Sequence, residues 1–208
     1  VIGLGYIGLP TAALIASHGI KVNGVDVNSK IVSTINKGKI HIVEPDLDKL
    51  VQSSVEEGNL SASMQVEKAD VFIIAVPTPF KDNHKPDLSY IEFAAKSIAP
   101  FLESGNLVIL ESTSPVGTTE KIREWIRELQ PNFCFPENDN DILTDVSIAY
   151  CPERVLPGNI LYELVQNDRI IGGLSKACSK KALDFYKIFV QADCLVTDSR
   201  TAELTKLV

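Results

Sequence analysis

The sequence predicts an α/β fold in which helices cover both faces of a doubly wound, mainly parallel sheet. Short runs rich in β-branched residues alternate with segments whose apolar residues recur at helical spacing, and this alternation is typical of parallel sheets. In addition, a glycine-rich turn separates the first apolar residues from the first helical segment. The predicted strands are 21–27, 70–76, 106–113, 147–151 and 168–173. The predicted helices are 9–18, 28–38, 87–98, 117–130 and 175–189.

Polar and capping residues predict the structure of the segments around these elements. Residues 131–146 are rich in Asp, Asn and Pro, so we expect a surface connection there. Thr118 is predicted to cap its helix. Residues 199–208 predict the first turns of a further helix, with Ser199 as its cap and Glu203 in the first turn or just past it.

The composition is that of an ordinary soluble globular protein and excludes several function classes. The 208 residues include 20 basic and 27 acidic side chains and are 45% hydrophobic. Without a basic tract we expect no nucleic-acid partner, and without an apolar run of about 20 residues we expect no membrane span. The four cysteines form no C-x-x-C pair, and the three histidines do not cluster with them, so we expect no metal site and reduced thiols in the cytoplasm.

The first motif is G-x-G-x-x-G, formed by Gly3, Gly5 and Gly8. Gly3 permits a tight turn, Gly5 lets the backbone approach a pyrophosphate, and Gly8 allows a helix to pack closely on its strand. Asp26 follows Gly8 by 18 residues, at the end of the next predicted strand. Its carboxylate can accept hydrogen bonds from both ribose hydroxyls and would repel a 2′-phosphate, so the pattern favours NAD over NADP. The alternative is an ordinary α/β turn with an incidental acid.

Ligands of open parallel sheets bind outside the carboxyl ends of the strands, so the residues that follow each strand are candidates for the site. Thr78 follows one strand, and Glu111, Ser112 and Thr113 follow the next. For the two threonines, the alternative role is in helix capping and turns. Lys30 has two equally plausible roles, contact with cofactor phosphates or a solvated helix residue.

Glu153 follows the strand around 147–151 and is a candidate for positioning water or acting as a base. The alternative is an ion pair, either with its neighbour Arg154 or with Arg169. Lys206 lies on the last predicted helix. A partly buried lysine can stabilise an oxyanion, whereas most helix lysines are simply solvated.

Seven motifs together resemble the UDP-glucose/GDP-mannose dehydrogenase family. They occur in order over the whole chain as "GLGYIGLP", "GVDVN", "AVPTPF", "ESTSPVGTTE", "CPER…PGN", "DRIIGG" and "AELTKL". Within the family, residues 149–173 and the "SRTAELTKL" segment are most similar to the members that oxidise UDP-N-acetyl-D-mannosamine. Members acting on UDP-N-acetylglucosamine share P-E-R and P-G-N, so they stay an alternative, as do UDP-glucose 6-dehydrogenases.

The resemblance implies a Rossmann-like domain and a four-electron oxidation of a UDP-sugar for surface polysaccharide synthesis. The alcohol at sugar C6 becomes a carboxylate and two NAD are reduced. A cysteine captures the aldehyde as a thiohemiacetal, the second hydride transfer makes a thioester, and water hydrolyses it. In this scheme Thr113 helps to order water, Glu153 orients the hydrolytic water, and Lys206 stabilises the oxyanions. The whole protein is implied to be a cytoplasmic homodimer.

Residue by residue, the resemblance implies two sets of contacts. The cofactor-binding positions are Gly3, Gly5, Tyr6, Ile7, Gly8, Asp26, Lys30, Pro77, Thr78, Ser112 and Thr113. The substrate-binding positions are Glu153, Arg154, Val155 and Lys206.

Two positions depart from the family pattern. Pro157 stands where UDP-glucose enzymes place a second glutamate, which fits an N-acetylamino sugar better than glucose. The family's nucleophile lies in a G-F-G-G-x-C segment that these residues do not contain, and Cys151 is not the matching position. We interpret Cys151 as a structural thiol.

The missing nucleophile segment, together with a last helix that no glycine or proline ends, leads us to expect a piece of a longer protein. Residues 1–197 would be its NAD-binding domain and 198–208 the start of a central, dimer-forming helix, with the catalytic cysteine and UDP-binding parts elsewhere. We also expect residues before Val1, because two residues are too few for a central strand ahead of Gly3. Two alternatives are a non-catalytic nucleotide-binding module and an NAD enzyme of the β-hydroxyacid type. The latter explains the glycine loop but not "ESTSPVGTTE" or "CPERVLPGN".

Overall fold

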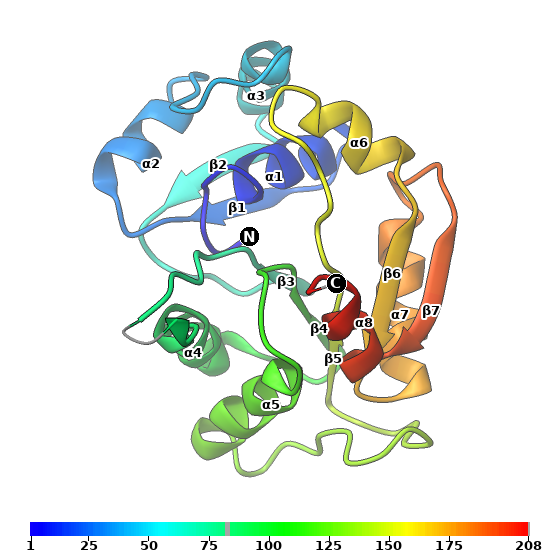
Figure 1. Ribbon diagram of the computed structural model, residues 1–208. Coiled ribbons are helices and arrows are strands. Elements are labelled where there is room, and N and C mark those ends of the chain that lie inside the picture. The colour runs from blue at the N-terminus through cyan, green and yellow to red at the C-terminus, as the bar shows by residue number, and fades with distance from the viewer. Residues whose placement is uncertain (82–83, 208) are drawn as a thin grey trace.

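The computed structural model describes residues 1–81 and 84–207, and it confirms the predicted alternation of strands and helices (Figure 1). The strands are β1 (Val22–Val25), β2 (Leu60–Ser63), β3 (Val71–Ile74), β4 (Asn106–Leu110), β5 (Val146–Tyr150), β6 (Arg169–Gly173) and β7 (Cys194–Asp198). The helices are α1 (Gly8–Ser17), α2 (Ser29–Ile35), α3 (Leu47–Glu56), α4 (Ser89–Ile98), the short 3₁₀ helix η2 (Ala99–Phe101), α5 (Thr118–Leu129), α6 (Ile160–Gln166), α7 (Lys176–Tyr186) and α8 (Ser199–Thr205). Every strand and helix predicted from the sequence is present, and 131–146 connects α5 to β5 without a helix or strand of its own up to Asp145.

The strands form one layer in the order β2-β1 and β3-β4-β5-β6-β7. Ile2 joins the two groups, because it makes parallel bridges to Val25 of β1 and to Ile74 of β3. The predicted parallel sheet is confirmed for β1 to β5. In this arrangement the glycine loop after Ile2 opens at the carboxyl ends of the central strands.

β6 runs antiparallel to β5, in register Ala149 to Gly173 and Tyr150 to Gly172. β7 then pairs with β6 in parallel. Because of this reversal, the first residue of β6, Arg169, lies near the carboxyl end of β5 and not at the opposite edge of the sheet. The reversal thereby brings a cation to the end of the sheet where ligands bind.

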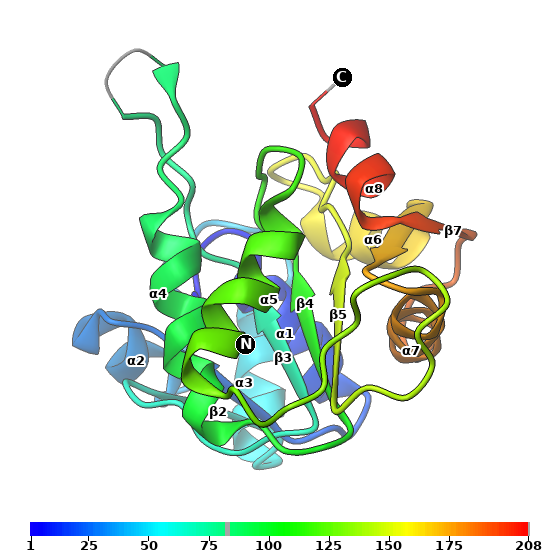
Figure 2. The same ribbon diagram turned by 90° about the horizontal axis from the view of Figure 1, so that it is seen from below.

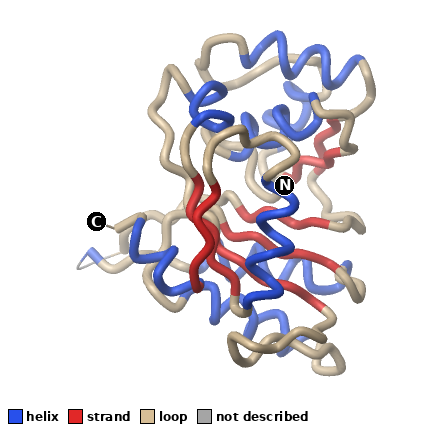
Figure 3. Tube along the Cα trace, turned by 90° about the vertical axis from the view of Figure 1, so that its right-hand side faces the viewer, coloured by secondary structure: helices blue, strands red, loops and turns tan. Residues whose placement is uncertain are grey.

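Alternating side chains of the strands supply the two apolar layers of the core. In β4, Leu107 and Ile109 belong to one buried cluster, whereas Val108 and Leu110 belong to the other, as expected for side chains that alternate across a strand. The first cluster includes α1, α3, α6 and α7, and the second includes α4, α5 and Ala202 of α8. Figure 3 shows the helices on both sides of the strand layer.

The structure corrects two predicted caps. Asp198, and not Ser199, caps α8, because its side chain accepts a hydrogen bond from the backbone N–H of Thr201. Thr118 does not cap α5 but is its first residue, and its hydroxyl donates to the carbonyl of Pro115. Among the described residues, no helix is long and apolar enough to cross a membrane.

Candidate functional site

The glycine loop has the close contacts that the motif predicts. Gly3 has a φ of +92°, and a Cβ at this position would lie 2.6 Å from the carbonyl oxygen of Ala75. A Cβ on Gly8 would lie 1.8 Å from the carbonyl oxygen of Gly3. At Gly5, by contrast, an added Cβ would meet no atom within 4 Å. Gly3 and Gly8 are therefore required by the fold of the loop itself, whereas Gly5 leaves an open space in front of the backbone.

The N-terminus of α1 offers backbone donors to that open space. Its N-cap residue, Ile7, makes no side-chain capping hydrogen bond, and the first turn contains no acidic residue. The first N–H groups of a helix have no partner within the helix, and they attract anions together with the helix dipole. An open cradle at Gly5 beside these donors fits the pyrophosphate of a dinucleotide.

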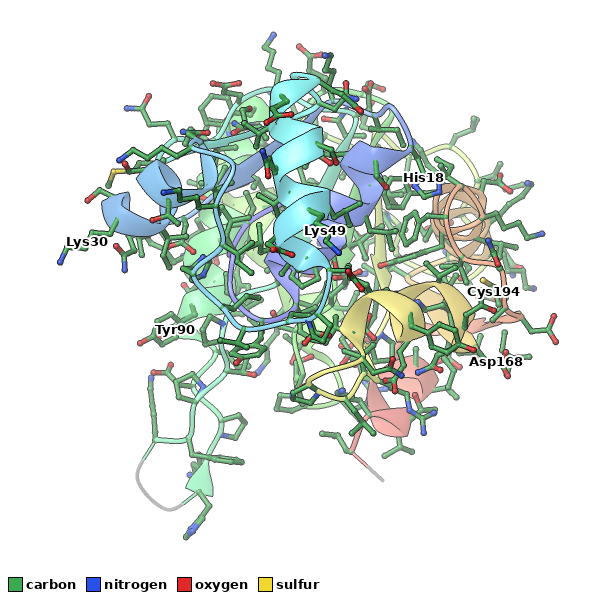
Figure 4. All side chains as sticks on the ribbon, turned by 90° about the horizontal axis from the view of Figure 1, so that it is seen from above. His18, Lys30, Lys49, Tyr90, Asp168 and Cys194 are labelled. Carbon is green, nitrogen blue, oxygen red and sulfur yellow. The ribbon has the colours of Figure 1, made fainter. Side chains whose placement is uncertain are left out.

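Asp26 lies just beyond β1 and is half-buried beside the loop. One of its carboxylate oxygens accepts from the N–H of Leu4 at 3.0 Å, and the other accepts from the N–H of Asn28 at 2.9 Å. Each oxygen keeps a further lone pair for a ribose hydroxyl. Lys30, by contrast, is exposed on α2 and points away from the body of the protein (Figure 4).

A pocket of about 220 Å³ lies at the carboxyl ends of β3, β4 and β5. It brings together residues that are up to 199 positions apart. Its lining consists of Ile7, Ala75, Val76, Pro77, Thr78, Glu111, Ser112, Thr113, Glu153, Val155 and Lys206. In Figure 2 the loops that follow these strands and the end of α8 lie at the same end of the molecule. Eight of the predicted site residues therefore line one pocket, and Ile7 connects it to the glycine loop.

Hydrogen bonds hold two of the pocket loops together. The hydroxyl of Thr78 donates to the carbonyl oxygen of Thr113 at 2.6 Å, and the hydroxyl of Ser112 donates to the carbonyl oxygen of Val76 at 2.7 Å. These bonds connect the ends of β3 and β4. Thr113 itself is exposed and lines the pocket, so its side chain is able to face a ligand.

Glu153 forms a buried ion pair with Arg169, and this decides between the two partners considered from the sequence. The carboxylate Oε2 and the guanidinium Nη1 are 2.6 Å apart, and the two side chains are 5% and 3% exposed. Burial alone would lower the pKa of Arg169, but the facing carboxylate of Glu153 opposes this and, together with Cys151, Tyr186 and Glu111, raises that pKa. The side chain of Arg154 is exposed, and only its backbone N–H reaches Glu153. The pair therefore fixes one oxygen of Glu153.

Lys206 follows α8, and its ammonium donates to the backbone carbonyl of Glu153. Burial lowers the pKa of Lys206, with Arg154 acting in the same direction and the carboxylate of Glu153 opposing both. A lysine that is held at a pocket wall with a lowered pKa still carries donors for a developing oxyanion.

Glu111 lies on the pocket floor, and its place in the sequence indicated a position near the site but no chemical role. Its carboxyl oxygens accept hydrogen bonds from Tyr186 at 2.7 Å and from Thr11 at 3.5 Å. Burial raises the pKa of Glu111 to about 7, with Arg169 opposing and Glu153 reinforcing this rise. Its position directly after β4 was the available sequence signal. The contact with Tyr186, 75 residues away, had none.

Cys151 is fully buried at the end of β5 and behaves as a structural thiol. Burial raises its pKa to about 12, although Arg169 opposes the rise. An activated nucleophile needs the opposite shift, because the thiolate is the reactive form. The structure thus argues against Cys151 as a nucleophile.

A larger cavity of about 380 Å³ lies at another place in the fold. Its lining includes Lys21, Val22, Asp70 and Val71, which stand at the starts of β1 and β3. This is the amino end of the strands, opposite the edge at which doubly wound sheets bind ligands. We therefore assign the functional site to the smaller pocket.

Known proteins match this chain along its whole length. Residues 1–190 match the NAD-binding domain of the UDP-glucose/GDP-mannose dehydrogenase family. A UDP-N-acetyl-D-mannosamine dehydrogenase from Campylobacter jejuni is 61% identical over 208 residues, which are 100% of this chain and 51% of that protein. An NDP-N-acetyl-D-galactosaminuronic acid dehydrogenase from Ralstonia nicotianae is 57% identical over 207 residues, which are 100% of this chain and 49% of that protein.

Solved structures agree with these matches. The UDP-N-acetyl-mannosamine dehydrogenase from Staphylococcus aureus has a TM-score of 0.91 and 44% sequence identity, covering 99% of this chain and 48% of that one. The chain therefore spans about half the length of the curated relatives it matches. The family match over residues 1–190 agrees with the geometry of the glycine loop and Asp26. The chain belongs to the UDP-glucose/GDP-mannose dehydrogenase family and comprises its NAD-binding domain.

Proposed function

We propose that the protein carrying this chain oxidises C6 of UDP-N-acetyl-D-mannosamine to the carboxylate. The observation that carries this proposal is the single pocket that places Thr113, Glu153 and Lys206 beside the glycine loop. Bound NAD would accept a hydride in each of two oxidation steps. The reaction product would supply an aminouronic acid for surface polysaccharide synthesis.

The residues of this chain have distinct roles in the proposed reaction. The backbone at Gly5 and the start of α1 hold the pyrophosphate, and Asp26 holds the ribose hydroxyls. Lys206 donates hydrogen bonds to the oxygen on C6 as negative charge develops there. Glu153 keeps one oxygen on Arg169 and one on the N–H of Arg154, and its remaining lone pairs orient the hydrolytic water.

The same proposal places the thiol nucleophile outside these 208 residues. Cys151 is buried with a raised pKa, as described above. A cysteine thiolate from another part of the protein would capture the aldehyde as a thiohemiacetal, transfer of the second hydride to NAD would convert it to a thioester, and water would then cleave that thioester. We further propose that 1–197 is the NAD-binding domain, that α8 begins a central helix through which the full-length protein dimerises, and that the enzyme acts in the cytoplasm. Sedimentation of the full-length protein tests the dimer, and a monomer contradicts it.

The identity of the sugar is the most specific part of the proposal. The mannosamine enzyme of Campylobacter jejuni is 61% identical and the galactosaminuronic enzyme of Ralstonia nicotianae 57%, so the second sugar series is the competing candidate. Pro157, in place of a second carboxylate, favours an N-acetylamino sugar over glucose.

An assay of the full-length protein tests this function. UDP-N-acetyl-D-mannosamine, the corresponding glucosamine and galactosamine compounds and UDP-glucose are each incubated with NAD or NADP, and absorbance at the NADH band is followed. We expect two equivalents of NADH per molecule of the mannosamine compound and the highest kcat/KM for it with NAD. Preference for another sugar overturns the substrate assignment, and preference for NADP overturns the role of Asp26.

Two variants separate the site from the rest of the surface. Lys206→Ala is expected to lower kcat about 100-fold or more, as loss of an oxyanion donor does. Lys180→Ala removes an exposed lysine on α7 and is expected to keep wild-type kcat.

We expect the isolated 208-residue chain to bind NAD but to form no NADH from any of the sugars. NADH formation by that chain alone contradicts an external nucleophile.

A further inference from the structure

Glu203 is fully buried on α8, yet its carboxylate binds the start of α5. Its Oε2 accepts a hydrogen bond from the backbone N–H of Gly117 at 2.5 Å. Its Oε1 accepts from the backbone N–H of Thr119 at 2.7 Å and from the hydroxyl of Thr119 at 2.6 Å. A carboxylate is stabilised at a helix N-terminus by the unpaired amides and by the helix dipole. Glu203 therefore performs, from 84 and 86 residues away, the capping that Thr118 was predicted to provide.

The two helices that this carboxylate joins are each next to a residue that lines the pocket. Thr113 lies in the loop that leads directly into α5, and Lys206 lies one turn beyond Glu203. α8 has only seven residues, and a helix of this length is not stable without tertiary contacts. One such contact is at Gly172, where an added Cβ would stand 2.7 Å from the Cβ of Ala202. Glu203 supplies a buried polar contact of the same helix.

We propose that Glu203 is a positioning residue, whose hydrogen bonds to the start of α5 set the placement of Lys206 across the pocket from the Thr113 loop. The proposal deepens the function proposed above and rests on it for its kinetic readout. Glu203 itself does not line the pocket, so it acts through Lys206. Without its carboxylate, the amides of Gly117 and Thr119 would have to be hydrated, and α8 would lose its buried polar link to α5.

The pKa of the Lys206 ammonium depends on the position of α8 and can be measured without any substrate. The charged groups that face it are Glu153 and Arg154, and its lowered pKa arises mainly from burial. If α8 moves outward, the ammonium becomes solvated and its pKa rises toward 10.5. Reductive methylation of Lys206, followed by peptide mass spectrometry over a pH series, measures this midpoint in the full-length protein.

Glu203→Gln is the primary variant, because it keeps the side-chain length but places an amide NH₂ against backbone N–H donors. We expect the labelling midpoint of Lys206 to move upward. We also expect kcat for the UDP-sugar to fall about 100-fold with KM changed less than about threefold, as for a misplaced reacting group. Glu203→Asp keeps the charge on a shorter stem and is expected to show both changes at intermediate size.

Glu120→Gln is the matched control. Arg200 and Glu120 form a 2.9 Å ion pair between the same two helices, but on the exposed surface. An exposed ion pair contributes little to the stability of a protein, so we expect this variant to keep the wild-type labelling midpoint of Lys206 and the wild-type kcat. A wild-type midpoint and kcat in Glu203→Gln, or the same changes in Glu120→Gln, overturn the proposal. Should Glu203→Gln fail to fold, wild-type values in Glu203→Asp overturn it as well.

The two readouts also separate this inference from the proposed function. If the wild-type protein turns over none of the UDP-sugars, the proposed function fails, whereas the labelling midpoint still tests the placement of Lys206. If the wild-type protein is active and Glu203→Gln leaves both readouts unchanged, only the positioning role fails.

Discussion

Replacement of Glu111 by glutamine removes the one carboxyl group on the pocket floor whose pKa burial raises to about 7. The change keeps the shape of the side chain. The amide oxygen can still accept the hydrogen bond from Tyr186, and the amide NH₂ can donate to the hydroxyl of Thr11. The substitution thus tests the ionisation of this site with little change in packing.

The magnitude follows from proton linkage. In the unfolded chain Glu111 ionises around its ordinary value of 4.5, whereas in the folded protein it holds its proton until about pH 7. The stability that the protonated group contributes is fully present below pH 4.5 and is lost as the pH rises through 7. At about 1.4 kcal/mol per pH unit, the interval from 4.5 to about 7 corresponds to about 3 kcal/mol. Glutamine does not ionise, so the variant escapes this loss.

Urea unfolding of both proteins between pH 4.5 and pH 8, followed by circular dichroism, measures the effect. The free energy of unfolding of the wild type, minus that of Glu111→Gln, should decrease by about 3 kcal/mol across this range. Groups common to both proteins cancel in the difference. A difference that stays constant with pH refutes the reasoning, and so does one that increases. In a Tyr186→Phe background the decrease should extend to higher pH, because the hydroxyl of Tyr186 lowers the pKa of Glu111.

Four further predictions concern Asp26, the glycine loop and the thiols. Asp26→Asn should weaken NAD binding about 10- to 100-fold in calorimetry, because hydrogen bonds to a charged group contribute about 1.5–3 kcal/mol; unchanged affinity contradicts its ribose role. Gly8→Ala should lower the free energy of unfolding by about 1–3 kcal/mol through its clash with the loop backbone. Gly5→Ala should keep stability within about 0.5 kcal/mol yet weaken NAD binding, and equal stability losses would refute the distinction. With an aromatic disulfide reagent at pH 8, exposed Cys134 should react at once and Cys151 only after unfolding, so early labelling of Cys151 contradicts its burial.

Local pattern predicted most of the fold because most elements carry their own apolar periodicity. Five of the described elements were not predicted, namely α3, β2, η2, α6 and β7. β2 reads LSAS, and β7 exposes Leu195 and Val196, so neither has the apolar run of a buried strand. Their strand conformation depends on pairing with β1 and β6, which are distant in sequence.

The N-terminus of α6 shows the same dependence on distant residues. Glu44 accepts hydrogen bonds from the backbone N–H groups of Gly158 and Ile160, which are 114 and 116 residues away. No capping residue close in sequence supplies these bonds, since Asn159 makes none through its side chain at this position. At α6 a remote carboxylate therefore makes the capping hydrogen bonds that a side chain next to the helix usually makes.

Sequence spacing was sufficient to predict the features that depend on adjacent residues. Gly3, Gly5 and Gly8 follow from backbone geometry within one turn, and Asp26 follows from the length of one helix and one strand. Which distant charges meet depends instead on the assembled fold. Arg169 pairs with Glu153 because β6 runs antiparallel to β5, and strand direction is set by the packing of the whole sheet. The ionisation of Glu111 likewise depends on burial by elements far along the chain, and burial is a property of the assembled core rather than of any local segment.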